Sequence, residues 1–343
     1  KSVSAVIIIT AGFSEADEQG KILQQEITQI SRCRGITVMG PNCLGLINPW
    51  HKLNASFGQP IGKPGSIALI SQSGALITAI QDVASNNKIG FSVLASIGNK
   101  ASLDEIDFLN NLKDEKKTKV IAAYLENISR GQEFMHAAER IAKTKPIVIL
   151  KAGRTRTGAK AAASHTGSLV GTDSAYNSAF QRAGVIRAES IEELFDISTA
   201  LAYQSLPKGN RVAVVTNAVG PGIMMSDALE IFGMEVAQPD EETKEKLSHI
   251  LPMTAGSIHN PVDVLGDANE DLYQKAMEIV LQSDSFDSVI VILTPQRMTD
   301  TEAIAETVVK ISKKYDKPVI ACFMGAVIFT KGVELLREGR ITQ

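Results

Sequence analysis

Two short motifs place small hydroxyl residues and glycine where a strand gives way to a helix. Ser71, Gln72, Ser73 and Gly74 follow the apolar run 67–70 and precede an amphipathic segment. Backbone N–H groups at such a helix start carry partial positive charge and bind phosphate or carboxylate. The same residues also suit a helix cap that holds no ligand, so both interpretations stand at this point.

The second motif lies in the last third of the chain, after the apolar run 212–216. Its residues are Asn217, Ala218, Val219, Gly220, Pro221 and Gly222. Proline just inside a helix, with glycine in the approach, is typical of a helix start. We therefore expect a second helix N-terminus that faces an anion.

A histidine and a glutamate are candidates for covalent phosphate chemistry. His165 lies among the small residues of 163–168, which leave an imidazole accessible. Glu126 ends the apolar run 120–124. A carboxylate that accepts the Nδ1–H of a histidine fixes the tautomer and stabilises the charged ring. Each residue alone is ordinary, a loop histidine and an exposed strand end, and only their combination with two anion-binding helix starts indicates a phosphate held against a histidine.

A basic segment, Lys151–Lys160, nearly matches a phosphate-binding P-loop. Ala159 stands where the motif needs lysine after Gly158, so we exclude a Walker A site. The remaining basic side chains indicate either a phosphate-attracting patch or a solvated loop.

Two turn-rich loops complete the set of candidates. In the loop 40–45, glycines surround Pro41, Asn42 and Cys43 directly after a short strand. Such a loop is a structural turn or, at the carboxyl end of a parallel strand, a ligand loop. The loop 260–267 is rich in Asn and Asp and is equally well explained as a turn.

The elements that must hold these residues alternate along the chain. Short β-branched runs are followed by amphipathic segments, which is typical of doubly wound parallel sheets covered by helices. Strands are expected at 5–10, 38–39, 67–70, 91–95, 120–124, 147–150, 212–216, 289–293 and 319–322, and helices at 15–33, 74 onward, 104–113, 132–143, 172–183, 190–202, up to 231, and 301–314.

Composition excludes several classes of protein. The 343 residues are 44% hydrophobic and 21% charged, so disorder and a coiled coil are excluded, and no apolar run is long enough for a membrane span. The net charge of −3 favours neither nucleic acid nor a membrane as partner, and three scattered cysteines predict neither disulfides nor a zinc site. A cytoplasmic location is the expectation.

Polar breaks divide the chain into three expected domains, at 1–58, 62–205 and 210–343. The first is too short to cover a parallel sheet. The last ends in what reads as a turn before another strand. We therefore expect that residues are missing at both ends.

Four motifs together resemble the NDP-forming acyl-CoA synthetases of the succinyl-CoA synthetase superfamily, and most of all the α subunit of ADP-forming acetate–CoA ligase. They are the segments 40–49, 71–74, 163–167 and 260–268, in the family's order, and the resemblance covers essentially the whole chain. It implies an α/β fold with the remnant of a Rossmann-like CoA-binding domain, followed by two flavodoxin-like doubly wound domains. It also implies a reversible reaction in which acyl-CoA, ADP and phosphate give a carboxylic acid, CoA and ATP through an acyl phosphate and a phosphohistidine.

The resemblance also implies roles for residues. His165 would be the phosphorylated nucleophile and Glu126 the carboxylate that orients it. Ser71–Gly74 would hold phosphate, with Asn217, Val219, Gly220 and Gly222 as the opposing helix start, and Pro41, Asn42 and Cys43 would lie near the CoA thiol and acyl group. The segment 153–168 would be a mobile loop that carries phosphate, with Gly153, Gly158 and Gly167 as hinges.

The resemblance further implies that CoA is a substrate and that ADP or ATP binds with Mg²⁺ to an ATP-grasp module. This sequence lacks that module, which would be either a separate β subunit or a fused domain. We expect no metal ligands in the chain itself, a short-chain carboxylic acid as the acyl partner, and a hetero- or homo-oligomer. Two other functions stay open. One is the regulatory acyl-CoA-sensing region of a protein lysine acetyltransferase, which usually lacks the histidine, and the other is a non-catalytic CoA- or nucleotide-binding module.

Overall fold

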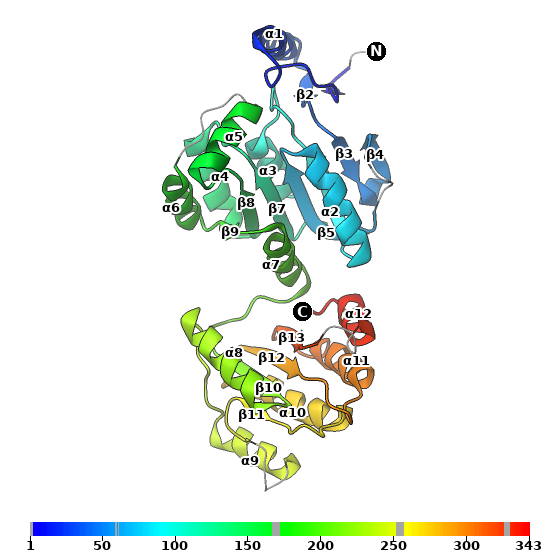
Figure 1. The fold of residues 1–343 in the computed structure, drawn as a ribbon, viewed down its shortest axis with the longest axis vertical. Coiled ribbons are helices and arrows are strands. Elements are labelled where there is room, and N and C mark those ends of the chain that lie inside the picture. The colour runs from blue at the N-terminus through cyan, green and yellow to red at the C-terminus, as the bar shows by residue number, and fades with distance from the viewer. Residues whose placement is uncertain (1–2, 59, 61, 167–171, 252–256, 326–329) are drawn as a thin grey trace. The chain divides into compact units, whose positions relative to one another are not determined.

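The computed structural model describes residues 3–58, 60, 62–166, 172–251, 257–325 and 330–343, with the side chains of 86 and 162–166 left out (Figure 1). Contacts divide the chain into two compact units, Lys1–Ala202 and Tyr203–Gln343. Each unit is described by itself. Within the described residues, no helix is both long and apolar enough to cross a membrane.

The first unit is built on a seven-stranded sheet whose central strands are parallel. The strand order is β4-β3-β6-β5-β7-β8-β9, and only β3 runs antiparallel to both of its neighbours. The bounds are β3 Gly45–Asn48, β4 Leu53–Ser56, β5 Pro64–Ser71, β6 Phe91–Ser96, β7 Val120–Leu125, β8 Ile147–Lys151 and β9 Ile186–Ala188.

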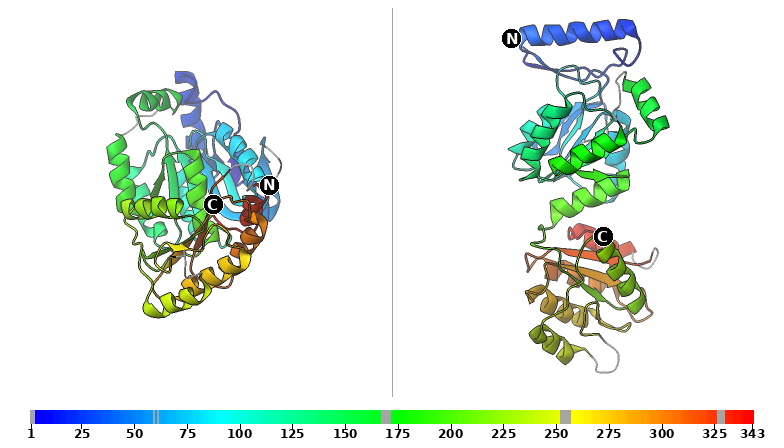
Figure 2. Two further views of the ribbon diagram at one scale, coloured as in Figure 1. Left: turned by 60° about the horizontal axis from the view of Figure 1, so that its bottom comes forward. Right: turned by 90° about the vertical axis from the view of Figure 1, so that its left-hand side faces the viewer.

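Helices bury both faces of this sheet, as Figures 1 and 2 show. Alternate strand residues such as Ile70, Ala123 and Ile149 pack in one cluster with Leu109 and Phe134. Parallel strands covered on both faces read as continuous apolar runs, which is why the sequence predicted them well. The helices are α2 Gly74–Asn86, α3 Glu105–Lys113, α4 Gly131–Ala142, α5 Arg156–Thr166, α6 Asp173–Ala183 and α7 Ile191–Tyr203.

The N-terminal segment of the first unit adds a two-stranded parallel sheet. It consists of β1 Ala5–Ile7, β2 Thr37–Met39 and, between them, α1 Glu18–Arg34. Met39 and Cys43 pack with Ala95 of β6, so this segment shares a small apolar cluster with the large sheet.

The second unit holds a four-stranded parallel sheet in the order β11-β10-β12-β13. The cluster around Val215, Tyr273 and Val291 fills one face, and α8 packs Leu229 against Val214 and Ile292 on the other. The bounds are β10 Val212–Thr216, α8 Val219–Ile231, α9 Glu241–Ile250, β11 Val262–Asp263, α10 Glu270–Gln282, β12 Ser288–Leu293, α11 Thr301–Ser312, β13 Val319–Phe323 and α12 Thr330–Glu338.

The predicted α/β fold class of doubly wound sheets is confirmed. Two expectations about single segments are wrong. Residues 53–56, for which no strand was expected, form strand β4. In the segment 153–168, predicted as a mobile loop, residues 156–166 form the helix α5, because the run of alanines favours helix more than Gly158 opposes it.

The three-domain division stays a prediction. The strands β3 and β4, which fall inside the expected first domain 1–58, extend the large sheet by pairing with β6.

Candidate functional site

The best-defined polar cluster lies where the central strands β5, β7 and β8 of the first unit end. Ser71 of β5 pairs with Tyr124 of β7, and Leu125 of β7 pairs with Lys151 of β8. Glu126 therefore follows β7 directly between two other strand ends. Ligands of open α/β sheets bind at this carboxyl edge.

Gln72 holds the loop that carries Glu126. Its side-chain Oε1 accepts the backbone N–H of Glu126 at 2.6 Å and that of Asn127 at 3.0 Å. Its Nε2 donates to Asn127 Oδ1 at 2.7 Å. All three residues are buried. The predicted phosphate-binding residue Gln72 thus has its side chain committed to Glu126 and Asn127.

Two lysines, partly buried Lys100 and buried Lys151, bind the carbonyls of the same two residues. Lys100 Nζ donates to Asn127 O at 2.9 Å, and Lys151 Nζ donates to Glu126 O at 2.7 Å. Lys100 also forms an ion pair with buried Glu105 at 3.0 Å. Burial raises the pKa of Glu105, and the charge of Lys100 opposes that rise. Glu126 and Asn127, the two residues after β7, are therefore each held by hydrogen bonds at the backbone N–H and at the backbone C=O.

Replacing Gln72 by leucine is expected to lower the free energy of unfolding by about 2–4 kcal/mol, because the N–H groups of Glu126 and Asn127 lose their acceptor. Trp50 is the one tryptophan of the chain and lies in the first unit, so its fluorescence during urea unfolding reports on this unit. Gln25→Leu, at an exposed position of α1, is the control. Equal stability of Gln72→Leu and the control would show that the Gln72 side chain does not hold the loop that carries Glu126.

The start of α2 has the geometry expected of Ser71–Gly74. Ser71 Oγ accepts the N–H of Ser73 at 3.0 Å and donates to its carbonyl at 2.8 Å. Ser73 caps the helix, since its Oγ accepts the N–H of Leu76 at 3.3 Å. Gly74 lies against Leu44, where an added Cβ would come within 3.2 Å. The motif therefore caps α2, and it places the partial positive charge of the helix N-terminus next to Glu126.

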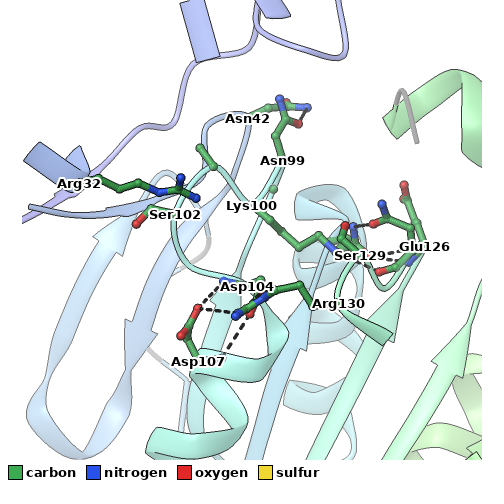
Figure 3. A pocket seen from close by; sticks show the side chains of 14 residues that line it. Arg32, Asn42, Asn99, Lys100, Ser102, Asp104, Asp107, Glu126, Ser129 and Arg130 are labelled. Carbon is green, nitrogen blue, oxygen red and sulfur yellow. Dashed lines mark hydrogen bonds and ion pairs between the residues drawn. The ribbon is translucent and has the colours of Figure 1, made fainter. Parts of the chain in front are cut away.

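A cavity of about 370 Å³ opens beside this edge (Figure 3). It is lined by Gln72, Glu126 and Asn127, and by Asn42 and Lys100. Arg130, which also lines it, binds Asp104 at 2.7 Å and Glu133 at 2.9 Å. The other lining residues are Arg32, Gly98, Asn99, Ala101, Ser102, Asp107 and Ser129.

The loop 40–45 contributes one side chain to this cavity. Asn42 has a positive φ of 54°, and its Nδ2 donates to Asn99 Oδ1 at 3.3 Å. Asn99 donates in turn to Gln24 at 2.9 Å and to Glu15. Asn42 is therefore anchored to α1 and to the loop before it.

Pro41 and Cys43 of the same loop are buried. The Cys43 thiol donates to Ile8 O at 3.3 Å, and burial raises its pKa to about 11. At neutral pH this thiol is protonated and turned into the core, which does not favour a nucleophilic role.

His165 lies in the last turn of α5, two residues beyond Ala163, and its side chain is outside the described residues. The backbone places α5 after the end of β8, the strand next to β7. The segment from the end of β8 through α5, which carries His165, thus begins at the same sheet edge as Glu126. Lys151, counted in the sequence with the basic segment, is buried and belongs to the core of that edge.

The second motif starts α8 in the second unit and repeats the plan of the first. Thr216 Oγ1 accepts the N–H of Ala218 at 3.1 Å, as Ser71 does for Ser73. Val219 and Gly220 are exposed, and Gly222 packs against Thr216 and Pro261. Asn217 is 2% exposed and its side chain exchanges hydrogen bonds with Thr294, so it joins two strand ends. The loop 260–267 is also structural, since Asn260 bonds Val212, Val214 and Ala237.

Sequence reasoning missed Lys100, Asn99, Asn127 and Arg130. Their contacts join segments far apart in the chain, and no local pattern marks them. Among the described residues, no three His, Cys, Asp or Glu side chains meet as metal ligands.

Comparison with known proteins assigns both units to one class of enzyme domain. Residues 64–201 match the succinyl-CoA ligase-like flavodoxin domain, and residues 212–343 match the ligase-CoA domain. The α subunit of acetate–CoA ligase [ADP-forming] II from Pyrococcus furiosus is 41% identical over 99% of this chain and 75% of its own length. A 4-hydroxybutyrate–CoA ligase [ADP-forming] from Nitrosopumilus maritimus is 40% identical over 99% of this chain and 49% of its own length.

The solved structure of the dinucleotide-forming acetyl-coenzyme A synthetase 1 of Ca. Korarchaeum cryptofilum, in complex with phosphate and ADP, superimposes with a TM-score of 0.95. It is 35% identical, and the match covers 99% of this chain and 74% of that one. The chain belongs to the NDP-forming acetyl-CoA synthetase family and corresponds to the α subunit or α domain of its members. It spans about half the length of several curated relatives and about three quarters of the separate α subunits. The family predicted from the motifs is confirmed.

Proposed function

We propose that this chain is the CoA- and phosphate-handling part of an ADP-forming acyl-CoA synthetase, working with an ATP-grasp subunit or domain. The observation that carries the proposal is the edge where Glu126 is held by Gln72, Lys100 and Lys151 beside the start of α2. This edge combines a carboxylate carried on a fixed backbone, a positive helix end and a cavity with an anchored amide.

In the first step proposed, an oxygen of inorganic phosphate attacks the thioester carbonyl of acyl-CoA. The C–S bond breaks, the CoA sulfur leaves with the electron pair and a proton from the phosphate, and an acyl phosphate forms. The start of α2 would hold the phosphoryl oxygens through fixed N–H dipoles, which stabilise charge without reorganising. Asn42, anchored by Asn99, would orient the acyl group or the thiol end of CoA.

In the second step proposed, a ring nitrogen of His165 attacks phosphorus. The P–O bond to the carboxylate breaks, and the free acid leaves with that electron pair. Neutral imidazole accepts and releases phosphoryl groups near pH 7. Glu126 would accept a hydrogen bond from the other ring nitrogen and stabilise the phosphorylated ring.

The phosphohistidine would then deliver its phosphate to Mg-ADP in the ATP-grasp module, which completes the family reaction. The exposed start of α8 in the second unit, at Val219 and Gly220, is proposed as a further phosphate-binding element. Cys43 and Asn217 are proposed to act through the loop backbone rather than through their side chains.

The acid is the open part of this proposal. Acetate is favoured because the α subunit from Pyrococcus furiosus is an acetate–CoA ligase, but the relative from Nitrosopumilus maritimus is named for 4-hydroxybutyrate. The test is ADP-dependent ATP formation by the full-length chain with its ATP-grasp partner. The assay contains phosphate and a panel of acetyl-, 4-hydroxybutyryl-, branched-chain acyl- and aryl-CoA. We expect ATP with at least one member, and no ATP with any of them would contradict the proposal.

A further inference from the structure

Lys151 is a buried charge that takes part in no step of the proposed reaction, although it binds the backbone of Glu126. It is the last residue of β8, and only 2% of its surface is exposed. Its ammonium donates to Glu126 O at 2.7 Å and to Ala152 O at 2.5 Å. It also lies 4.4 Å from the centre of the Tyr176 ring.

These three contacts belong to three segments around the site. Glu126 opens the loop after β7, Ala152 opens the connection from β8 to α5, and Tyr176 lies in the first turn of α6. The helix α5, which carries His165, lies between Ala152 and Tyr176 in the chain. One ammonium therefore links the backbone of Glu126 to the connection that leads into α5 and to the helix α6 that follows it.

Stability alone does not account for this lysine. A buried ammonium is costly, and an apolar side chain of similar length is often as stable or more so. Among the described residues Lys151 has no carboxylate partner within ion-pair distance; burial lowers its pKa to about 8, with a smaller contribution from the charge of Arg187.

Lys145 offers a contrast with the same chemistry. It is 8% exposed, and its ammonium donates to Leu112 O at 2.5 Å and to Glu115 O at 2.8 Å. Both carbonyls lie at the end of α3, where such a cation satisfies a helix C-terminus. Lys145 precedes β8, whereas Lys151 ends it, so the two lysines bind at opposite ends of one strand.

We propose that Lys151 is a positioning residue for phosphoryl transfer between the acyl phosphate and His165. The inference rests on the proposed function. In this half-reaction a ring nitrogen of His165 bonds to phosphorus as the P–O bond to the carboxylate breaks, and the ammonium sets the register of Glu126 against the segment that carries the ring. Phosphorylation of His165 from ATP takes place in the ATP-grasp module and does not need that register.

The experiment measures both half-reactions with the full-length chain and its ATP-grasp partner at pH 7. Single-turnover phosphorylation of His165 is followed once from Mg-ATP and once from labelled inorganic phosphate with the best acyl-CoA of the panel. Lys151→Met and Lys145→Met are compared with the wild type. If Lys151→Met does not fold, Tyr176→Leu, which removes the contact to α6, takes its place with the same asymmetry expected.

We expect Lys151→Met to slow phosphorylation from acyl-CoA and phosphate by about 10²-fold, the effect of a small misplacement of reacting groups. Its phosphorylation from Mg-ATP stays at the wild-type rate, and Lys145→Met is unchanged in both. An unchanged acyl-CoA reaction, or an equal loss in both half-reactions, overturns the proposal. A wild-type chain that no donor phosphorylates refutes the proposed function itself, which is a distinguishable result.

Discussion

Replacing His165 by asparagine is expected to lower ATP formation by at least about 10⁴-fold, the scale of losing a covalent nucleophile. Asparagine retains polarity and approximate size but has no nitrogen that accepts a phosphoryl group near pH 7. The measurement is steady-state turnover of the full-length chain with its ATP-grasp partner. His136→Asn, at an exposed position of α4, is the matched control and is expected to behave as the wild type.

The outcome separates the functions left open by the sequence. A regulatory acyl-CoA sensor or a passive binding module has no use for the imidazole, so His165→Asn would leave its CoA binding and its signalling unchanged. Full turnover in His165→Asn would show that the histidine carries no phosphate.

Replacing Glu126 by glutamine is expected to slow turnover by about 10²-fold. This is the lower end of the effect of a general acid–base group in a transition state. The amide of glutamine is isosteric with the carboxylate. The hydrogen bonds from residue 126 to the side chains of Gln72 and Lys151 stay intact, because residue 126 contributes only main-chain atoms to them. What is lost is the negative charge that stabilises a phosphorylated imidazole. The defect should appear in kcat rather than in the KM for CoA.

Glu139→Gln, at an exposed position of α4, is the control for this change. A Glu126→Gln variant with wild-type kcat would show that the carboxylate does not act on the phosphorylated ring. Loss of stability with no kinetic effect would assign Glu126 to the fold alone.

The sheet and the site strands were predictable because their physics is local. Strands β5, β7 and β8 are buried on both faces and therefore read as unbroken apolar runs. Polar and small residues directly after such runs indicated the carboxyl edge, at which both Ser71 and Glu126 lie. The family motifs then indicated a phosphate.

Other parts of the fold were hidden by competing local signals. The glycines of the segment 153–168 suggested a loop, while the alanines after Gly158 favoured a helix. The strands β3 and β4 are joined by a 3-10 turn that begins at Pro49, and each strand has only four residues, too few for an alternating pattern to be recognised.

The side chains that hold the site in place could not be predicted from the sequence, for a different reason. Gln72, Lys100 and Lys151 bind the backbone of residues 126–127 from three different strand ends, and such contacts depend on sheet order and register. The basic residues from Lys151 to Lys160 suggested a phosphate-attracting patch or a solvated loop, because a lysine followed by other basic residues is usually exposed. Only the packed structure shows that the lysine is enclosed.

The most direct test of the proposed function is the location of the phosphate on the protein. The full-length chain is incubated with the proposed ATP-grasp partner and Mg-ATP, and acid-labile, base-stable phosphate is mapped by mass spectrometry. We expect phosphate on His165, discharged when the acid and CoA are added and absent from His165→Asn. With a partner proven active, no phosphate on the chain, or phosphate on another residue that turns over normally, would contradict it.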